Sequence, residues 1–139
     1  MLEIRHLQQA ETGLIKCLFA TAGMQVDQVN RKFFTDDRNI LLAAYITGEP
    51  AGFLYAYKLE RMNSAKPLIL LYSIDVFKLF RKQGIGTALI EMLKEMAASA
   101  GCSEIFVLTN ESNIAATKLY QKTGGVRENY DDVMYTYQL

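Results

Sequence analysis

The fold is decided by the stretch Leu68-Ile69-Leu70-Leu71-Tyr72-Ser73-Ile74-Asp75-Val76-Phe77, which is followed by Arg81-Lys82-Gln83-Gly84-Ile85-Gly86 and by an amphipathic segment from Thr87 to Ala100. The apolar first run predicts a buried strand. After the bend, apolar residues recur at steps of three and four, which predicts a helix with one buried face that ends at Gly101. The centre of the chain is therefore a strand, a basic glycine-containing loop and a helix.

The rest of the sequence predicts one α/β (α+β) domain over residues 1–139, with a mixed sheet and helices on both of its faces. Further helices are expected at residues 8–22, 25–34 and 113–122. Thr47-Gly48-Glu49-Pro50 predicts a tight turn, and residues 60–66 are expected to form a loop. The additional strands are expected at residues 2–7, 40–46, 51–59, 104–109 and 133–139.

Composition excludes several classes of protein. Lys plus Arg (15) equals Asp plus Glu (15), so no global field attracts nucleic acid or an anionic membrane. No apolar run reaches the roughly 20 residues needed to span a bilayer, and the first five residues do not resemble a signal peptide, so we expect a cytoplasmic protein. Cys17 and Cys102 are expected to be reduced thiols, and with His6 as the single histidine no metal site is expected.

The basic loop has the features of a phosphate site. Gly84 and Gly86 let the backbone approach a ligand closely, and the helix N-terminus carries partial positive charge. Two familiar motifs are absent: Leu89 stands where the dinucleotide fingerprint needs glycine, and Gly86-Thr87 lacks the lysine of the ATP-binding P-loop. A plain strand-to-helix turn flanked by solvated charges is the alternative interpretation.

A polar pair follows downstream. Asn113 and Tyr120 are seven residues apart, so on one helix they share a face. The alternatives are a tyrosine that packs on the core and an asparagine that only caps the helix.

Together these motifs resemble a known family. Ile74 to Phe77, Arg81 to Ile90 and Asn113 to Gly124, in this order and spacing, resemble the GNAT superfamily of acyl-CoA-dependent N-acetyltransferases. Residues 74–90 and the ending Gly125-Val126-Arg127-Glu128 look most like the small aminoglycoside 3-N-acetyltransferases. The resemblance implies a single GNAT-like domain with a mostly antiparallel central sheet.

The resemblance also implies roles for individual residues toward acetyl-CoA as cosubstrate. Backbone groups of Ile74, Asp75 and Val76 would pair with the pantetheine arm, and Asn113 would bond it. Tyr120 would lie beside the thioester sulfur as general acid. The pyrophosphate would be wrapped by Arg81, Lys82, Gln83, Gly84, Ile85, Gly86 and Thr87.

The base is less evident, although an amine with a pKa near 10.4 must lose a proton before it attacks. Family members often carry an acidic residue three positions before Val76, where this chain has Ser73. Asp75 shares the sheet face of Ser73 and is the expected base, acting through a water. Glu104, Glu128, Asp131 and Asp132 are the other candidates, although the last three also fit a solvated turn.

The resemblance predicts an N-acetyltransferase that acts on a primary amine of a small molecule by direct transfer in a ternary complex. An aminoglycoside-like or polyamine-like cation, and hence antibiotic resistance, is expected if Asp36, Asp37, Asp75, Glu128, Asp131 and Asp132 converge. An apolar acceptor pocket lined by Tyr45, Tyr55, Tyr57, Tyr72 and Tyr130 is the other possibility. Because of Ser73, a non-catalytic acyl-CoA-binding or regulatory module stays open as an alternative. A homodimer that pairs through the final strand is a further expectation.

Overall fold

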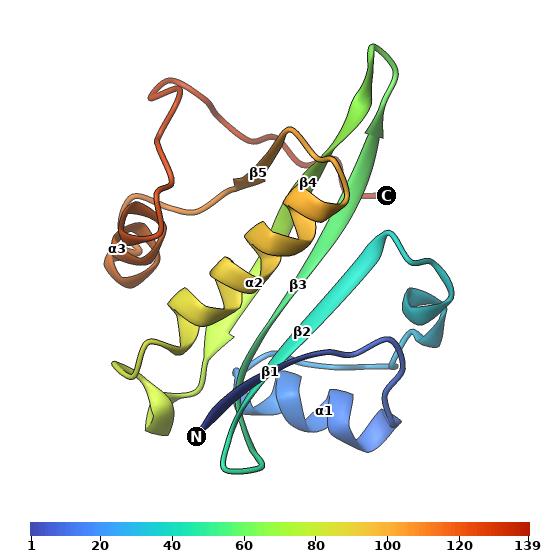
Figure 1. Ribbon diagram of the computed structural model, residues 1–139, viewed down its shortest axis with the longest axis vertical. Coiled ribbons are helices and arrows are strands. Elements are labelled where there is room, and N and C mark those ends of the chain that lie inside the picture. Colours follow the sequence, from blue (N-terminus) through green and yellow to red (C-terminus); the bar gives the residue numbers. More distant parts are fainter.

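The centre of the molecule is a five-stranded sheet, seen in a computed structural model that describes residues 1–139 (Figure 1). The strands lie side by side in chain order, and only the β4–β5 pair is parallel. The predicted mixed, mostly antiparallel sheet is therefore confirmed. The strands are β1 (Leu2–His6), β2 (Asn39–Ile46), β3 (Glu49–Arg61), β4 (Ser64–Val76) and β5 (Glu104–Val107).

Helices cover both faces of this sheet. The helices are α1 (Thr12–Thr21), α2 (Ile85–Ser99) and α3 (Ile114–Lys122), with short 3-10 helices η1 (Arg31–Thr35) and η2 (Lys78–Phe80). Neighbouring strand residues point to opposite faces. Phe53 accordingly packs with Ile15 and Leu18 of α1, whereas Leu54 packs with apolar residues of α2. Each face of the sheet therefore has a core of its own.

Two tight hairpins connect β2, β3 and β4. Thr47 (φ 48°) and Gly48 (φ 83°) form the two-residue loop of the first, with the positive φ angles that match strand twist. The predicted loop at residues 60–66 is wrong, because β3 and β4 continue to a turn at Met62 and Asn63. The exposed, polar ends of this hairpin lack the apolar alternation that marks a strand in sequence.

The predicted helix at residues 25–34 is also wrong, since only η1 forms in that region. Val26 and Val29 are β-branched, and Asp27 and Asn30 have side chains that compete with helical hydrogen bonds. The Asn30 side chain accepts a hydrogen bond from the Lys32 amide (3.2 Å) and so caps the short η1 turn.

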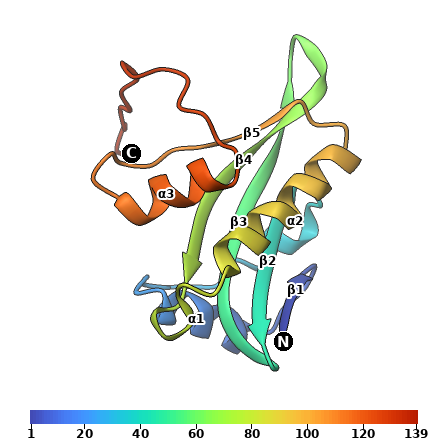
Figure 2. The same ribbon diagram turned by 60° about the vertical axis from the view of Figure 1, so that its left-hand side comes forward.

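The predicted strand at residues 133–139 does not form. The segment 126–139, called here the C-terminal segment, leads away from the end of α3 (Figure 2). Backbone groups of residues 132–139 make no hydrogen bond within the chain, and Tyr135 and Tyr137 are 83% and 88% exposed. A strand exists only with a partner strand, and this segment has none within the chain.

The other helix ends agree with the sequence: Gly23, Gly101 and Gly124 follow α1, α2 and α3 with positive φ. Both cysteines are free. None of the helices has the length and apolar character that crossing a bilayer requires.

Candidate active site

The sheet opens between β4 and β5. The two strands pair only from Leu68 with Glu104 to Leu71 with Val107, although β4 continues to Val76. In Figure 2 the chain after β5 turns away from β4 toward α3. The last five residues of β4, Tyr72 to Val76, therefore have no partner in β5, and Ser73 to Val76 pair only with β3.

The open edge of β4 presents backbone polar groups. The Phe77 amide donates to the Ala51 carbonyl of β3 (2.9 Å). Because N–H and C=O groups of successive strand residues point to alternate sides, those of Ile74 and Val76 point toward the opening. The Val76 carbonyl there accepts a hydrogen bond from Arg81 Nε (3.0 Å). The other groups fit an extended ligand that lies like an added strand.

A bulge places side chains on both sides of this opening. Tyr55 pairs with Ser73 and Ala56 with Leu71, so Tyr72 is an extra residue without a partner. Beyond the bulge, Ile74 and Val76 pack on the α2 face. Asp75 lies directly opposite Phe53, on the α1 face.

The N-terminus of α2 lies beyond the end of β4 and is uncapped. Lys82 (φ 64°) and Gly84 (φ 76°) are left-handed, a geometry that turns amide groups of such a loop toward a shared concavity. No side chain caps this 15-residue helix and its first turn holds no acidic residue. The amides of Ile85, Gly86 and Thr87 are thus available, beside the exposed Arg81 and Lys82. The arrangement fits the diphosphate of coenzyme A.

Close packing joins α3 to this region. A Cβ on Gly86 would lie 3.0 Å from Leu119 Cδ2 and 3.6 Å from Val76 Cγ2, so only glycine fits there without a shift. Lys94 of α2 also donates to the Thr123 carbonyl at the end of α3 (3.1 Å). Gly86 therefore has a packing role that its sequence motif did not indicate.

The predicted polar pair occupies α3. Tyr120 is half-buried against the α2-face core, its hydroxyl bonds no protein group, and burial raises its pKa, so it stays protonated at neutral pH. The Asn113 side chain accepts from the Ala116 amide (3.1 Å) and caps α3. This is the capping role named as an alternative, and the roles of both residues toward a cofactor stay predictions.

Asp75 is half-buried and forms no ion pair. Burial raises the pKa of its carboxyl, and the Arg81 guanidinium opposes part of that rise. A higher pKa makes a carboxylate a stronger base. Asp75 is on the α1 face and Tyr120 on the α2 face, so the two flank the sheet from opposite sides.

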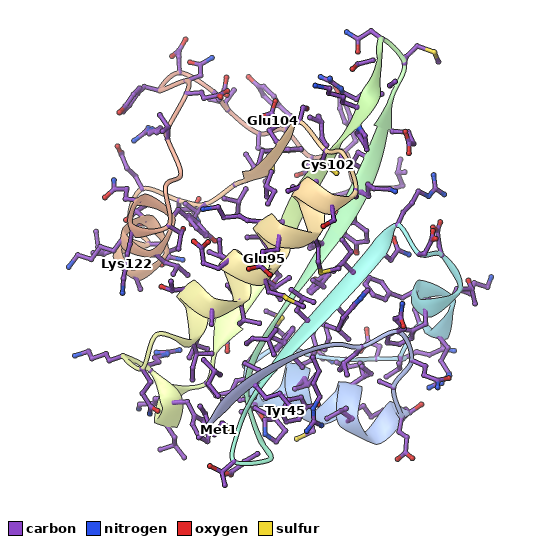
Figure 3. The ribbon with its side chains drawn as sticks, in the orientation of Figure 1. Met1, Tyr45, Glu95, Cys102, Glu104 and Lys122 are labelled. Atoms are coloured by element: carbon purple, nitrogen blue, oxygen red, sulfur yellow. The ribbon has the colours of Figure 1, made fainter.

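The other candidate carboxylates do not gather here. Glu104 begins β5, opposite Leu68 (Figure 3). Leu68 lies six residues, or about 20 Å, along β4 from Ile74. Asp36 is bound by Arg38 (2.7 Å), which lowers its pKa to about 2. Glu128, Asp131 and Asp132 are exposed on the C-terminal segment.

Sequence reasoning missed one further residue. A Cβ on Gly52 would lie 2.6 Å from the Asp75 carbonyl oxygen, so this glycine lets β3 approach the end of β4. An isolated glycine inside a strand pattern is the signal that could have indicated it. The bulge at Tyr72 leaves no comparable trace in the sequence.

Solved structures with the same fold include two aminoglycoside acetyltransferases from uncultured soil metagenomic samples. HMB0005 is 34% identical, with a TM-score of 0.87 and 99% of each chain covered. Meta-AAC0020 is 26% identical, with a TM-score of 0.87 over 99% of this chain and 96% of that one. These neighbours agree with the resemblance to small aminoglycoside acetyltransferases.

Two curated relatives are matched over part of their length. N-alpha-acetyltransferase 30 of Dictyostelium discoideum is 29% identical over 97 residues, which are 70% of this chain and 51% of that protein. YdhI of Bacillus subtilis is 37% identical over 51 residues, which are 37% of this chain and 32% of that protein. The chain thus spans about half or less of the length of these two.

The family model of the acetyltransferases matches nearly the whole sheet and all three helices, over residues 3–125. Its span includes the open edge of β4, the α2 N-terminus and α3. The chain therefore belongs to the Acetyltransferase (GNAT) family.

Proposed function

We propose that the protein transfers an acetyl group from acetyl-CoA to a primary amine of a small molecule, directly and within a ternary complex. The observation that carries this proposal is the uncapped N-terminus of α2 next to the open edge of β4. Such a site can hold a diphosphate at the helix and an extended arm along the strand. Membership of the family supports the same reaction.

The chain's own residues supply the proton transfers. Asp75, through a water, takes the proton that the ammonium must lose before the nitrogen attacks the acetyl carbon. An N–H group at the open edge of β4 stabilises the oxyanion that forms. As the C–N bond forms and the C–S bond breaks, Tyr120 gives its proton to the leaving sulfur, and the nitrogen loses its excess proton to solvent.

The acceptor is proposed more coarsely. Meta-AAC0020 was crystallised with sisomicin, which supports a polyamine-bearing acceptor for this chain too. The carboxylates that would attract such a cation are dispersed over the chain, however, and the charge of Asp36 is already paired with Arg38. We therefore propose only that the acceptor is a small-molecule amine.

The test is thiol release from acetyl-CoA across a panel of aminoglycosides, polyamines, amino acids and arylalkylamines, with calorimetry of acetyl-CoA binding in parallel. We expect binding and amine-dependent thiol release. Binding without release on any amine would instead favour the non-catalytic acyl-CoA-binding module, which is the function suggested by Ser73. Absence of binding would contradict both.

We also propose a homodimer. The residues Val133, Tyr135, Tyr137 and Leu139 alternate as the apolar face of a strand, yet they are exposed. The outer edge of β5 is unpaired. Pairing of the C-terminal segment with that edge in a second copy would satisfy both, in a symmetric exchange.

A further inference from the structure

A pocket of about 370 Å³ lies on the α1 face of the sheet. It is formed between α1, residues 25–30, η1 and the strands β2 and β3. This volume is in the range of sites that bind small molecules. The segment 25–30, which the sequence suggested would be helical, forms one wall.

The walls of the pocket are mainly aromatic and aliphatic. They contain no lysine or arginine, and the only carboxylate is that of the exposed Asp27. The apolar lining residues are Ile15, Phe19, Val26, Val29, Phe33, Phe34, Leu41, Tyr55 and Tyr57.

A row of tyrosines connects this pocket with the candidate active site. The Tyr72 ring at the bulge lies 5.3 Å from that of Tyr55 and 5.7 Å from that of Tyr57, between ring centroids. Tyr55 lies opposite Ser73, two residues before Asp75.

Asp75 does not line the pocket but lies on the same face of the sheet, next to the fully buried Phe53. The Phe19 ring, which lines the pocket, lies 5.0 Å from the Phe53 ring. Phe53 is directly opposite Asp75 on the neighbouring strand, and such pairs have Cβ atoms about 5 Å apart on the same face. A molecule in the pocket therefore lies on the same face of the sheet as Asp75.

The lining selects the chemistry of the occupant. A polyhydroxylated polycation would lose water from many polar groups and find one carboxylate in return, which is unfavourable. An aromatic ring would pack against the phenylalanines and tyrosines, and the tyrosine faces also attract an ammonium group. Resting on the acetyl transfer proposed above, we infer that the acceptor is a primary amine on an aromatic body, whose ring fills this pocket while its amine extends past Tyr55 and Tyr72 toward the end of β4 that carries Asp75.

The test compares kcat/KM for phenethylamine and tryptamine with that for methylamine, spermidine and kanamycin, measured by thiol release. We expect the aromatic amines to exceed each of the others by at least about ten-fold, the discrimination that an apolar pocket provides. Release with kanamycin or spermidine at equal or higher kcat/KM would overturn the aromatic acceptor while leaving acetyl transfer intact. No release with any amine would overturn both.

Variants locate the effect in the pocket. Val26→Trp, which fills the pocket from its loop wall, and Tyr57→Ala, which removes a ring, should raise KM for phenethylamine about ten-fold or more. The loss in kcat/KM should be at least about ten-fold larger for phenethylamine than for methylamine, while Tyr57→Phe should retain the wild-type KM for phenethylamine. Equal losses for methylamine and phenethylamine, or no loss for either, would place the acceptor elsewhere.

Discussion

At the scale of single residues, replacing Tyr120 tests the proposed general acid directly. Its half-buried hydroxyl has no protein partner, and its raised pKa keeps it protonated. Tyr120→Phe should lower kcat by roughly 10²–10⁴-fold, the range for lost general acid catalysis. The rate of thiol release at saturating substrates gives kcat. Calorimetry should show that the affinity for acetyl-CoA is unchanged. Tyr137→Phe, at an exposed position, is the matched control, and a wild-type kcat for Tyr120→Phe would remove this residue from the mechanism.

Asp75 predicts a pH dependence. Burial raises the pKa of Asp75, so the basic form appears only above the usual carboxyl range, and kcat/KM should rise with pH through that raised pKa. Asp75→Asn should lower kcat/KM and remove this rise, which is the acidic limb of the pH profile. A limb that persists in the variant would assign the base to another group.

A stability measurement distinguishes a loss of activity in Asp75→Asn from a loss of folded protein. A carboxyl whose pKa is higher in the folded than in the unfolded state binds its proton more tightly when folded. Its contribution to stability is therefore present at low pH and is lost as pH rises through the folded pKa. Asp75→Asn, which is neutral at every pH, should be at least as stable as the wild type at pH 7 in urea denaturation, and this advantage should shrink toward low pH.

At the scale of elements, the N-terminus of α2 can be tested by charge alone. Gly84 (φ 76°) has open space around it, so a substitution meets backbone strain but no clash. Gly84→Asn and Gly84→Asp have nearly the same shape, and asparagine tolerates the left-handed region. The aspartate adds a negative charge where the diphosphate is expected, so calorimetry should show a loss of acetyl-CoA affinity of at least about ten-fold relative to the asparagine variant. Equal affinities would contradict the cradle.

Gly86 is not a clean probe of the same cradle. A side chain there would press on Leu119, so a loss of binding in Gly86→Val would mix the cradle with the packing of α3. The glycine pair in the sequence thus has two physical reasons, a left-handed turn at Gly84 and close packing at Gly86.

Much of the fold was predictable from local patterns. The strand–loop–helix from β4 to α2, the turn at Thr47 and Gly48 and the glycine after each α-helix follow from periodicity and backbone preference. Residues 25–30 were not predictable, because their helical spacing of valines reflects burial in a loop that lines a pocket. The bulge at Tyr72 and the opening of β4 from β5 depend on pairing between strands, which a single sequence does not record. The candidate site residues were therefore predicted from motifs, and their roles stay predictions, whereas their placement on two faces of the sheet was not predicted.

At the scale of the whole molecule, the C-terminal segment predicts the state of association. Tyr135 and Tyr137 share the apolar face of the expected strand, while Thr136 points to the other face. Sedimentation should show a dimer for the full chain and a monomer for the double variant Tyr135→Asp, Tyr137→Asp, because the charges would be buried on pairing. Thr136→Asp should remain dimeric. A monomeric full chain at high micromolar concentration would contradict the exchange of segments.

The opening between β4 and β5 should also make the resistance of the protein to proteolysis depend on the concentration of acetyl-CoA. The edge of β4 lacks a β5 partner along five residues, and the acetyl-CoA arm would complete the sheet there if it binds as proposed. A ligand that binds the native state alone adds about 2.7 kcal/mol at a hundred times its Kd. We therefore expect limited proteolysis to cleave the ligand-free protein much faster than the acetyl-CoA-loaded one, and expect cells starved of acetyl-CoA to degrade it sooner. Equal cleavage rates would mean that the open edge of β4 is stable without the ligand.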